Sequence, residues 1–200
     1  MKLSKKFMIV CCAMSVLALG GCGKDEKDET PKEKIKIVEN RVYETPKKPT
    51  EEMKKVYNQL SKALDGSDEA KKAELVGVNF AYQFFTLSNK TGNEDVGGLT
   101  FIPEASREEF KQYAVSYYYG NYKTVVNQHG KDALPYVKKH SVTGVEATQL
   151  IYNDQTYDGY YVKLKLTYKS SELKEKQLKT TMTLQVIPDE NGVWRVIAAE

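Results

Sequence analysis

Residues 67–88, SDEAKKAELVGVNFAYQFFTLS, decide the fold of this chain. Apolar side chains recur here at intervals of three and four residues, which predicts a helix. They form two stripes, which are Ala73/Val76/Phe80/Phe84/Leu87 and Leu75/Val78/Tyr82/Phe85. A helix that is apolar on two sides is covered on two sides. We therefore expect this segment to be a central helix against which a sheet curls.

Beyond residue 142 the apolar period changes to alternate residues, which indicates β-strands. Strands are predicted over residues 142–152, 160–169, 178–186 and 193–198. The second alternates most regularly, because valine and leucines occupy one face and lysines the other. Asn191-Gly192 is a hairpin signal before the last strand. Helices followed by antiparallel strands predict an α+β domain with a curved four-stranded meander.

Two more helices are predicted before the strands. Thr50 caps the first, which holds two glutamates in its first turn. The second begins with a capping box formed by Ser106 and Glu109. Its expected buried face consists of Phe110, Tyr113, Ala114, Tyr117 and Tyr118. Two short elements are also expected, a strand over residues 99–102 and a helix over residues 132–140.

The first 22 residues have the pattern of an export signal. Residues 1–6 contain three lysines and no acid, and the 13 residues 7–19 are apolar except for Ser15. That apolar run is shorter than the roughly 20 residues of a membrane-spanning helix and fits a signal peptide. Gly20-Gly21-Cys22 follows. The segment resembles the lipobox signal of bacterial lipoproteins, which implies a signal peptide over residues 1–21 and a lipid on Cys22. The alternative is an ordinary signal peptide in which the cysteine stands by chance.

The lipobox resemblance implies a position on the extracytoplasmic face of the bacterial cell membrane, with the lipid on Cys22 as the membrane contact. Residues 22–49 are rich in charged residues, threonine and proline. Such a segment cannot bury enough apolar surface to offset its ordering entropy. We predict a flexible stalk over residues 22–49 and a single domain over residues 50–200. Alternatively, residues 35–43 are a short extended piece that docks onto the domain.

Composition excludes several classes of function. Without residues 1–21 the chain has 27 basic and 27 acidic side chains, because the signal holds three lysines and no acid. Balanced charge gives no general attraction to nucleic acid. All three cysteines lie within residues 11–22, so the domain has none for a disulfide, a metal site or a nucleophile. No histidine-based or carboxylate-based metal motif is present, and we expect neither a metal nor a cofactor.

The order of the predicted elements resembles the nuclear transport factor 2-like superfamily over residues 50–200. The resemblance implies a cone-like fold with a cavity. Enzymes of that superfamily place an Asp or His base and a Tyr donor inside the cone, whereas other members are accessory or scaffold domains of envelope machines. The fold alone therefore does not determine the function.

Few residues of the domain are candidates for catalysis. His129 lies in a predicted loop and His140 at a predicted solvated helix end, so we expect both to be exposed and non-catalytic. Alternatively, one of them acts as a catalytic base. Gly97-Gly98 is typical of a turn, and a phosphate-binding loop would need a following Lys-Ser/Thr that the sequence lacks. We therefore predict no catalytic residue, and a protein that is not an enzyme.

Clustered tyrosines favour a binding surface. The chain has 14 tyrosines, with Tyr117-Tyr118-Tyr119 and Tyr122 close together. Consecutive helical residues point ~100° apart, so some of these rings are exposed or line a cavity. In one interpretation Tyr117 and Tyr118 pack in the core and Tyr119 lies at a wet rim; in the other they form a partner surface. The predicted partner-binding residues are Tyr119, Tyr122, Lys163, Lys165 and Lys169, with Trp194 as a further candidate that is alternatively a core residue.

These features predict a non-catalytic, membrane-anchored lipoprotein that binds a protein partner in a bacterial envelope assembly. The alternative is a small-molecule binder, or an isomerase- or cyclase-type enzyme that uses the cone cavity. The lining of that cavity discriminates between the two. Tyr, Phe and Leu without a buried Asp, Glu or His favour binding, whereas a buried Asp beside a Tyr donor favours catalysis.

Overall fold

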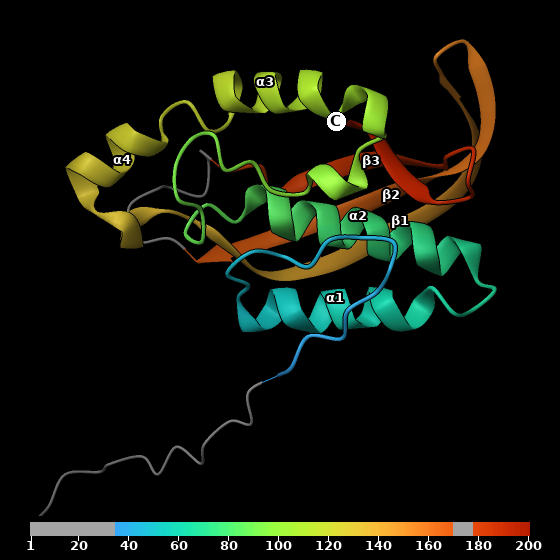
Figure 1. Cartoon of the computed structure of the whole chain (residues 1–200), viewed down its shortest axis with the longest axis horizontal. Helices are drawn as coiled ribbons and strands as arrows, with labels where there is room; N and C mark the ends of the chain where they lie inside the picture. The colour runs from blue at the N-terminus through green and yellow to red at the C-terminus, as the bar shows by residue number, and fades with distance from the viewer. Residues whose placement is uncertain (1–34, 170–177) are drawn as a thin grey trace, which may run out of the picture. The chain divides into compact units, whose positions relative to one another are not determined.

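The computed structural model describes residues 35–169 and 178–200. In this part of the chain the helices come first, and they are α1 (Glu51–Ala63), α2 (Glu69–Phe85), α3 (Arg107–Tyr117) and α4 (Tyr122–His129). The strands that follow are β1 (Tyr136–Tyr152), β2 (Gln155–Lys169), β3 (Thr181–Pro188) and β4 (Trp194–Ala199). The prediction of an α+β domain with helices packed on a four-stranded antiparallel meander is confirmed (Figure 1).

The sheet has the strand order β1-β2-β3-β4, and each neighbouring pair is antiparallel. A tight turn joins β1 to β2, in which Asn153 and Asp154 have φ angles of 49° and 59°. Asn and Asp adopt this left-handed conformation more readily than most side chains. The sheet is not strongly curled or closed, so the pronounced curvature expected from the sequence is not observed. β4 lies at an edge of this sheet.

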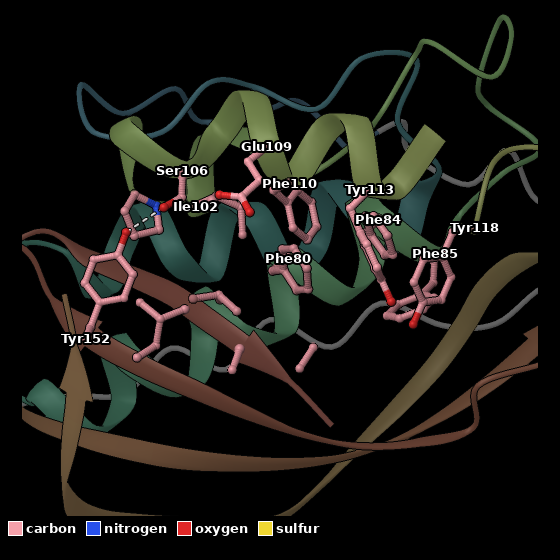
Figure 2. Close-up of a pocket in the computed structure, with 15 residues that line it drawn as sticks. Phe80, Phe84, Phe85, Ile102, Ser106, Glu109, Phe110, Tyr113, Tyr118 and Tyr152 are labelled. Atoms are coloured by element: carbon pink, nitrogen blue, oxygen red, sulfur yellow. Dashed lines mark hydrogen bonds between the residues drawn. The ribbon is translucent and has the colours of Figure 1, made fainter. Parts of the chain in front are cut away.

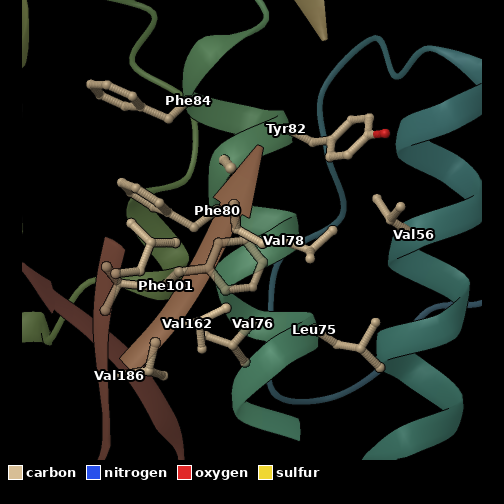
Figure 3. Packing of buried hydrophobic residues seen from close by; sticks show 14 of the residues in the cluster. Val56, Leu75, Val76, Val78, Phe80, Tyr82, Phe84, Phe101, Val162 and Val186 are labelled. Atoms are coloured by element: carbon tan, nitrogen blue, oxygen red, sulfur yellow. The ribbon is translucent and has the colours of Figure 1, made fainter. Parts of the chain in front are cut away.

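Helix α2 is covered on two sides, as its two apolar stripes predict (Figure 3). Val76 and Phe80 face the sheet, and Leu75, Val78 and Tyr82 face α1. All five side chains are buried. Because side chains are buried on both sides of α2, this one helix joins two layers into a single core. Burial of each large apolar side chain contributes about 1.5–3 kcal/mol to stability.

Two contacts set the distance of α2 from its neighbours. A Cβ atom at Gly77 would lie 3.1 Å from Leu184 Cδ1 and 3.2 Å from Val162 Cγ1, so the glycine allows helix and sheet to approach closely. On the other side of the helix, Asn79 Nδ2 donates to Val56 O of α1 at 3.0 Å. This buried amide connects α2 to the backbone of α1, which fixes the position of one helix along the other.

The helix N-termini agree with the sequence prediction in α1 but not in α3. Thr50 Oγ1 accepts a hydrogen bond from the Met53 amide at 3.2 Å, as predicted for the cap of α1. At α2 the cap is Asp68, whose carboxylate accepts from the Lys71 amide at 2.9 Å. Ser106 makes no capping hydrogen bond at α3, so the predicted capping box is wrong.

Residues 35–49 pack on the domain, so the prediction that a flexible stalk extends to residue 49 is wrong for this segment. Tyr43 is 3 % exposed, its ring stacks on Phe101, and its hydroxyl donates to Trp194 O at 2.8 Å. Tyr57 Oη donates to Tyr43 O at 2.6 Å. Burial of this ring with its hydroxyl satisfied fixes residue 43 of the segment against the domain. The predicted stalk over residues 22–34, like the signal and Cys22, lies outside the described residues.

Two short predicted elements are wrong. Residues 99–102, predicted as a strand, contain the 3₁₀-helix Leu99–Phe101, which begins after Gly98 at φ 81°. Residues 132–140, predicted as a helix, contain the start of β1, where Tyr136 pairs with Lys169 and His140 with Leu166. Pairing with a strand far along the chain overrides the local helical pattern in this segment.

A chain that begins at residue 50 is expected to be less stable than one that begins at residue 35. Loss of a buried aromatic side chain costs about 3–5 kcal/mol, and Tyr43 is such a residue. Urea unfolding followed by circular dichroism measures the difference. Within the longer chain, Tyr43→Ala should show a similar loss, and Val42→Ala, at a 38 % exposed position, is the matched control. Equal unfolding midpoints for the two chains would contradict a structural role of residues 35–49.

Candidate functional site

A cavity of about 450 Å³ lies between α2, α3, β4 and the end of β1 (Figure 2). We call it the aromatic cavity. Its walls are aromatic side chains of the two helices together with the last residues of β4, chiefly Phe80, Phe84, Phe85, Phe110, Tyr113 and Val196–Ala199. A volume in this range is typical of sites that hold a drug-sized molecule or a few side chains of a partner.

Phe84 lies at the centre of the aromatic wall. Its ring centroid is 5.4 Å from that of Phe80 on α2, 5.4 Å from that of Phe110 on α3 and 5.3 Å from that of Tyr118. Such spacings are favourable for aromatic pairs. Because Phe84 is only 4 % exposed and belongs to the core helix, packing holds this wall in place before any ligand arrives.

A pair of hydroxyl groups lies at one end of the aromatic cavity (Figure 2). Ser106 Oγ and Tyr152 Oη are 2.7 Å apart and share a hydrogen bond. The backbone of Ser106 is not extended, with φ −102° and ψ −1°, so its hydroxyl points to Tyr152 instead of capping α3. Glu109 also lines the cavity, and its side chain is exposed. The hydroxyl pair can donate one hydrogen bond and accept others from a bound molecule.

Exposed tyrosines lie beside the cavity at the C-terminal end of α3. Tyr113 is 52 % exposed, Tyr117 is 74 % exposed and Tyr118 is 47 % exposed. The predicted buried face of this helix is therefore wrong for these three residues. Ala114 is the fully buried residue of α3, and Phe110 packs against the core, so a narrower side of the helix faces inward. The three rings remain accessible beside the aromatic cavity.

The prediction that Tyr119 and Tyr122 form an accessible surface is wrong, because they are 1 % and 8 % exposed. Tyr119 Oη donates to Phe84 O at 2.6 Å and accepts from the Gly97 amide at 3.3 Å. Tyr122 Oη donates to Lys90 O at 2.6 Å. Backbone groups of α2 and the following loop satisfy both hydroxyls, which allows the rings to be buried. The interpretation that placed Tyr117 and Tyr118 in the core and Tyr119 at the rim is thus inverted.

The three predicted partner-binding lysines lie on the other face of the sheet. Lys163, Lys165 and Lys169 alternate along β2 with residues that pack under α2, and alternate residues of a strand point to opposite faces. Lys163 Nζ also pairs with Glu146 at 2.6 Å. The structure therefore separates the lysines from the tyrosines, and the predicted joint surface does not exist.

Trp194 is a core residue, which is one of the two interpretations that the sequence left open. It is 5 % exposed, its ring lies against Tyr160 with centroids 5.4 Å apart, and its Nε1 donates to Glu69 at 2.7 Å.

The two histidines lie outside the aromatic cavity. His129 is exposed at the end of α4. His140 is half-buried on β1 rather than at a helix end, and its Nδ1 lies 3.1 Å from Tyr82 Oη. Burial lowers the pKa of His140, because desolvation disfavours the imidazolium. Its ring also meets that of Tyr82 edge-on, with centroids 5.4 Å apart, which is a favourable geometry for aromatic pairs.

The described part of the chain shows neither a metal site nor a membrane-spanning helix. No group of three or more His, Cys, Asp or Glu side chains within residues 35–169 and 178–200 is arranged to hold a metal ion. Across the same residues, none of the helices has the length and apolar character needed to span a bilayer.

Sequence reasoning missed the pair Ser106 and Tyr152. The two residues are 46 positions apart, on different elements, and no local pattern links them. A weak signal was present in α2, where Phe84 and Phe85 belong to different apolar stripes and so favour a helix end with aromatic rings on both sides.

Comparison of the chain with protein-family models, with curated proteins and with solved structures finds no match.

Proposed function

We propose that this protein is a non-catalytic lipoprotein of the bacterial envelope, anchored through Cys22, which binds a protein partner at the aromatic cavity. One observation carries the choice of site: an aromatic cavity of about 450 Å³ opens beside three exposed tyrosines. Aromatic side chains that are exposed together on a soluble domain are typical of interaction sites. The lipid anchor rests on the export signal at residues 1–22.

The geometry supports an apolar segment of the partner as the occupant. The ring centroids of Tyr113 and Tyr117 lie 4.6 Å apart, and Tyr113 lines the cavity, so the two exposed rings form one aromatic surface that continues its wall. The wall around Phe84 is already packed, so binding orders few additional groups. Preformed aromatic pockets of this kind contribute much of the affinity at protein interfaces.

The lining of the aromatic cavity supports binding rather than catalysis. Its carboxylate, Glu109, is exposed to solvent, and its hydroxyl groups on Ser106 and Tyr152 bond to each other. A general base needs a fixed position beside the reacting group. Glu109 is exposed, and no hydrogen bond or ion pair with the described residues holds its carboxylate in place.

A second candidate function is the binding of a small apolar molecule. The hydroxyl pair of Ser106 and Tyr152 favours it, because a polar end in an aromatic cavity would orient a ligand with one carbonyl or hydroxyl group. For the fold we propose membership of the nuclear transport factor 2-like superfamily, on the order of elements and the cavity between helices and sheet. The weak curl of the sheet departs from the cone expected there.

Replacement of the anchoring cysteine should release the protein from the membrane. A diacylglyceryl group on Cys22 supplies two acyl chains, which are enough for stable anchoring. Cys22→Ala is therefore expected in the soluble fraction after a high-salt wash, whereas the unchanged chain sediments with membranes. A Cys22→Ala chain that still sediments would place the anchor elsewhere.

Substitution of the exposed tyrosines should weaken partner binding. A photo-crosslinking amino acid at position 117 of the full chain identifies the partner in cells, and the same amino acid at position 151 is the control. Ile151 is 74 % exposed, equal to Tyr117. It points to the opposite face of β1 from Tyr152, which lines the cavity, whereas Tyr117 packs against the cavity residue Tyr113. Against the purified partner, Tyr113→Ala and Tyr117→Ala should each raise Kd about fivefold or more, and Ile151→Ala should leave it unchanged.

Thermal unfolding of the three variants is the control for folding. We expect Tm to be nearly unchanged in all three, because the three side chains are exposed. Crosslinks from position 151 and none from position 117 would contradict the proposed site. The small-molecule candidate would be favoured by two results together. Position 117 gives no protein crosslink, and a fluorescent naphthylamine dye binds the protein saturably with an affinity that Phe84→Ala lowers.

A further inference from the structure

One exposed stripe of α3 joins an aromatic surface to a carboxylate. Glu109, Tyr113 and Tyr117 are four residues apart, so their side chains lie on one side of the helix. We call these three residues the α3 stripe. Glu109 is exposed, and the exposed fractions of Tyr113 and Tyr117 are 52 % and 74 %. Glu109 and Tyr113 also line the aromatic cavity, so the α3 stripe begins at that cavity (Figure 2).

The two ends of the α3 stripe carry polar groups of opposite kind. The Glu109 carboxylate accepts no hydrogen bond and forms no ion pair with the residues that the structure describes. Within the same residues, the Tyr117 hydroxyl has no hydrogen-bond partner either. A carboxylate is an acceptor, and a phenol hydroxyl can donate to it. The stripe therefore has an acceptor at one end, a donor at the other and an exposed ring between them.

This order makes the α3 stripe complementary to itself. Tyr113 is the midpoint, because it lies four residues from Glu109 and four from Tyr117. When two copies of α3 lie antiparallel about a two-fold axis beside Tyr113, the Tyr117 hydroxyl of each copy falls opposite the Glu109 carboxylate of the other. The same contact then forms twice, and the two Tyr113 rings meet at the axis. Self-complementarity of this kind is what a C2 interface requires.

The exposed rings provide about half of the area that a dimer needs. An aromatic side chain can bury about 150–250 Å², so the exposed parts of Tyr113, Tyr117 and Tyr118 amount to roughly 350 Å² in each copy. Two copies together would bury roughly 700 Å² of ring surface, against about 1,200–2,000 Å² in a standard interface. Gln112 and Ser116 are exposed beside the stripe and add to this area. We therefore expect a weak dimer.

We propose that the partner of the α3 stripe is a second copy of this chain, which lays its own α3 antiparallel across the first with Tyr113 at the two-fold axis. The inference rests on the proposed function, since it uses the same exposed tyrosines and names their partner. An unrelated segment would need a donor and an acceptor at matching separation, whereas this chain already has both. Anchoring of both copies in one membrane would raise their local concentration, which favours association through a small interface.

The first experiment uses a residue at the two-fold axis. All natural cysteines lie within residues 11–22, so an introduced cysteine is the one thiol of the domain. Tyr113→Cys in the full chain, oxidised in membranes, should give a disulfide-linked dimer on a non-reducing gel, because an axial residue meets its own copy. Ile151→Cys, at a 74 % exposed position on β1, and Lys123→Cys, at an exposed position on α4, are the matched controls. They and the unchanged chain should stay monomeric.

The second experiment tests the polar contact. Sedimentation of the full chain in detergent measures the dimer Kd, and Tyr117→Phe, which keeps the ring and removes the hydroxyl, should raise it about fivefold or more. Glu109→Gln should raise it as well. The chain with both changes should be no weaker than the weaker single variant, because both remove the same contact. Glu39→Gln, at an exposed position before α1, is the control for loss of one negative charge and should leave Kd unchanged.

Three results would overturn the proposal. The first is a monomer at every concentration together with no crosslink from Tyr113→Cys. The second is equal crosslinking from Ile151→Cys. The third is a dimer whose Kd is unaffected by both Tyr117→Phe and Glu109→Gln, since its contact would lie elsewhere. A different protein captured by photo-crosslinking at position 117, without a dimer from Tyr113→Cys, would overturn the second copy as partner and leave the proposed function standing.

Discussion

Helix α2 is covered by the sheet on one side and by α1 on the other, and the remaining elements take their positions from this arrangement (Figure 3). Gly77 brings the helix close to Val162 and Leu184, and Asn79 bonds to the backbone of α1. Close packing of this kind transmits small changes in volume across the core. Loss of either covering layer would expose one apolar stripe of α2 to water.

The candidate site depends on the same helix. Phe84 is at once a core residue and the centre of the aromatic wall, so the cavity is an extension of the core rather than a feature of mobile loops. At the C-terminus of α2, Tyr119 Oη donates to Phe84 O, a carbonyl that the end of the helix leaves without an intrahelical partner. A side chain that is buried for this structural reason is unavailable to a partner. The neighbouring Tyr117 and Tyr118 carry the exposed aromatic surface instead.

The same helix end organises the loop that follows it. This loop returns over the end of α2, where Tyr119 Oη accepts from the Gly97 amide and Tyr122 Oη donates to the backbone carbonyl of Lys90. The loop residue Lys90 is largely buried as a result.

Periodic patterns made the central features of the fold predictable. The two stripes of α2 and the alternation along β2 depend on neighbours close in sequence, and both predictions are confirmed. Features that depend on distant contacts were not predictable. Tyr43 looked like part of a charged stalk because its partners, Phe101 and Trp194, are remote in the sequence.

The buried face of α3 was predicted wrongly for the same reason. Its sequence places aromatic residues around much of the helix, and only packing on α2 determines that Ala114 is buried while Tyr113 and Tyr117 are exposed. The predicted binding site was wrong as a consequence, because Tyr119 and Tyr122 were assigned to the surface from local sequence alone. Lys163, Lys165 and Lys169 were placed correctly on the polar face of β2, but the sequence does not say which layer that face adjoins.

Native-state hydrogen exchange tests most directly whether α2 is the element on which the structure depends. Amides of residues 76–82 should exchange only through global unfolding, with an opening free energy within about 1 kcal/mol of that from denaturant unfolding. Amides of α3 should exchange through smaller, local openings, because this helix has one fully buried residue and covers a cavity. Faster exchange in α2 than in α3, or an α2 that opens while β2 and β3 stay protected, would contradict the account.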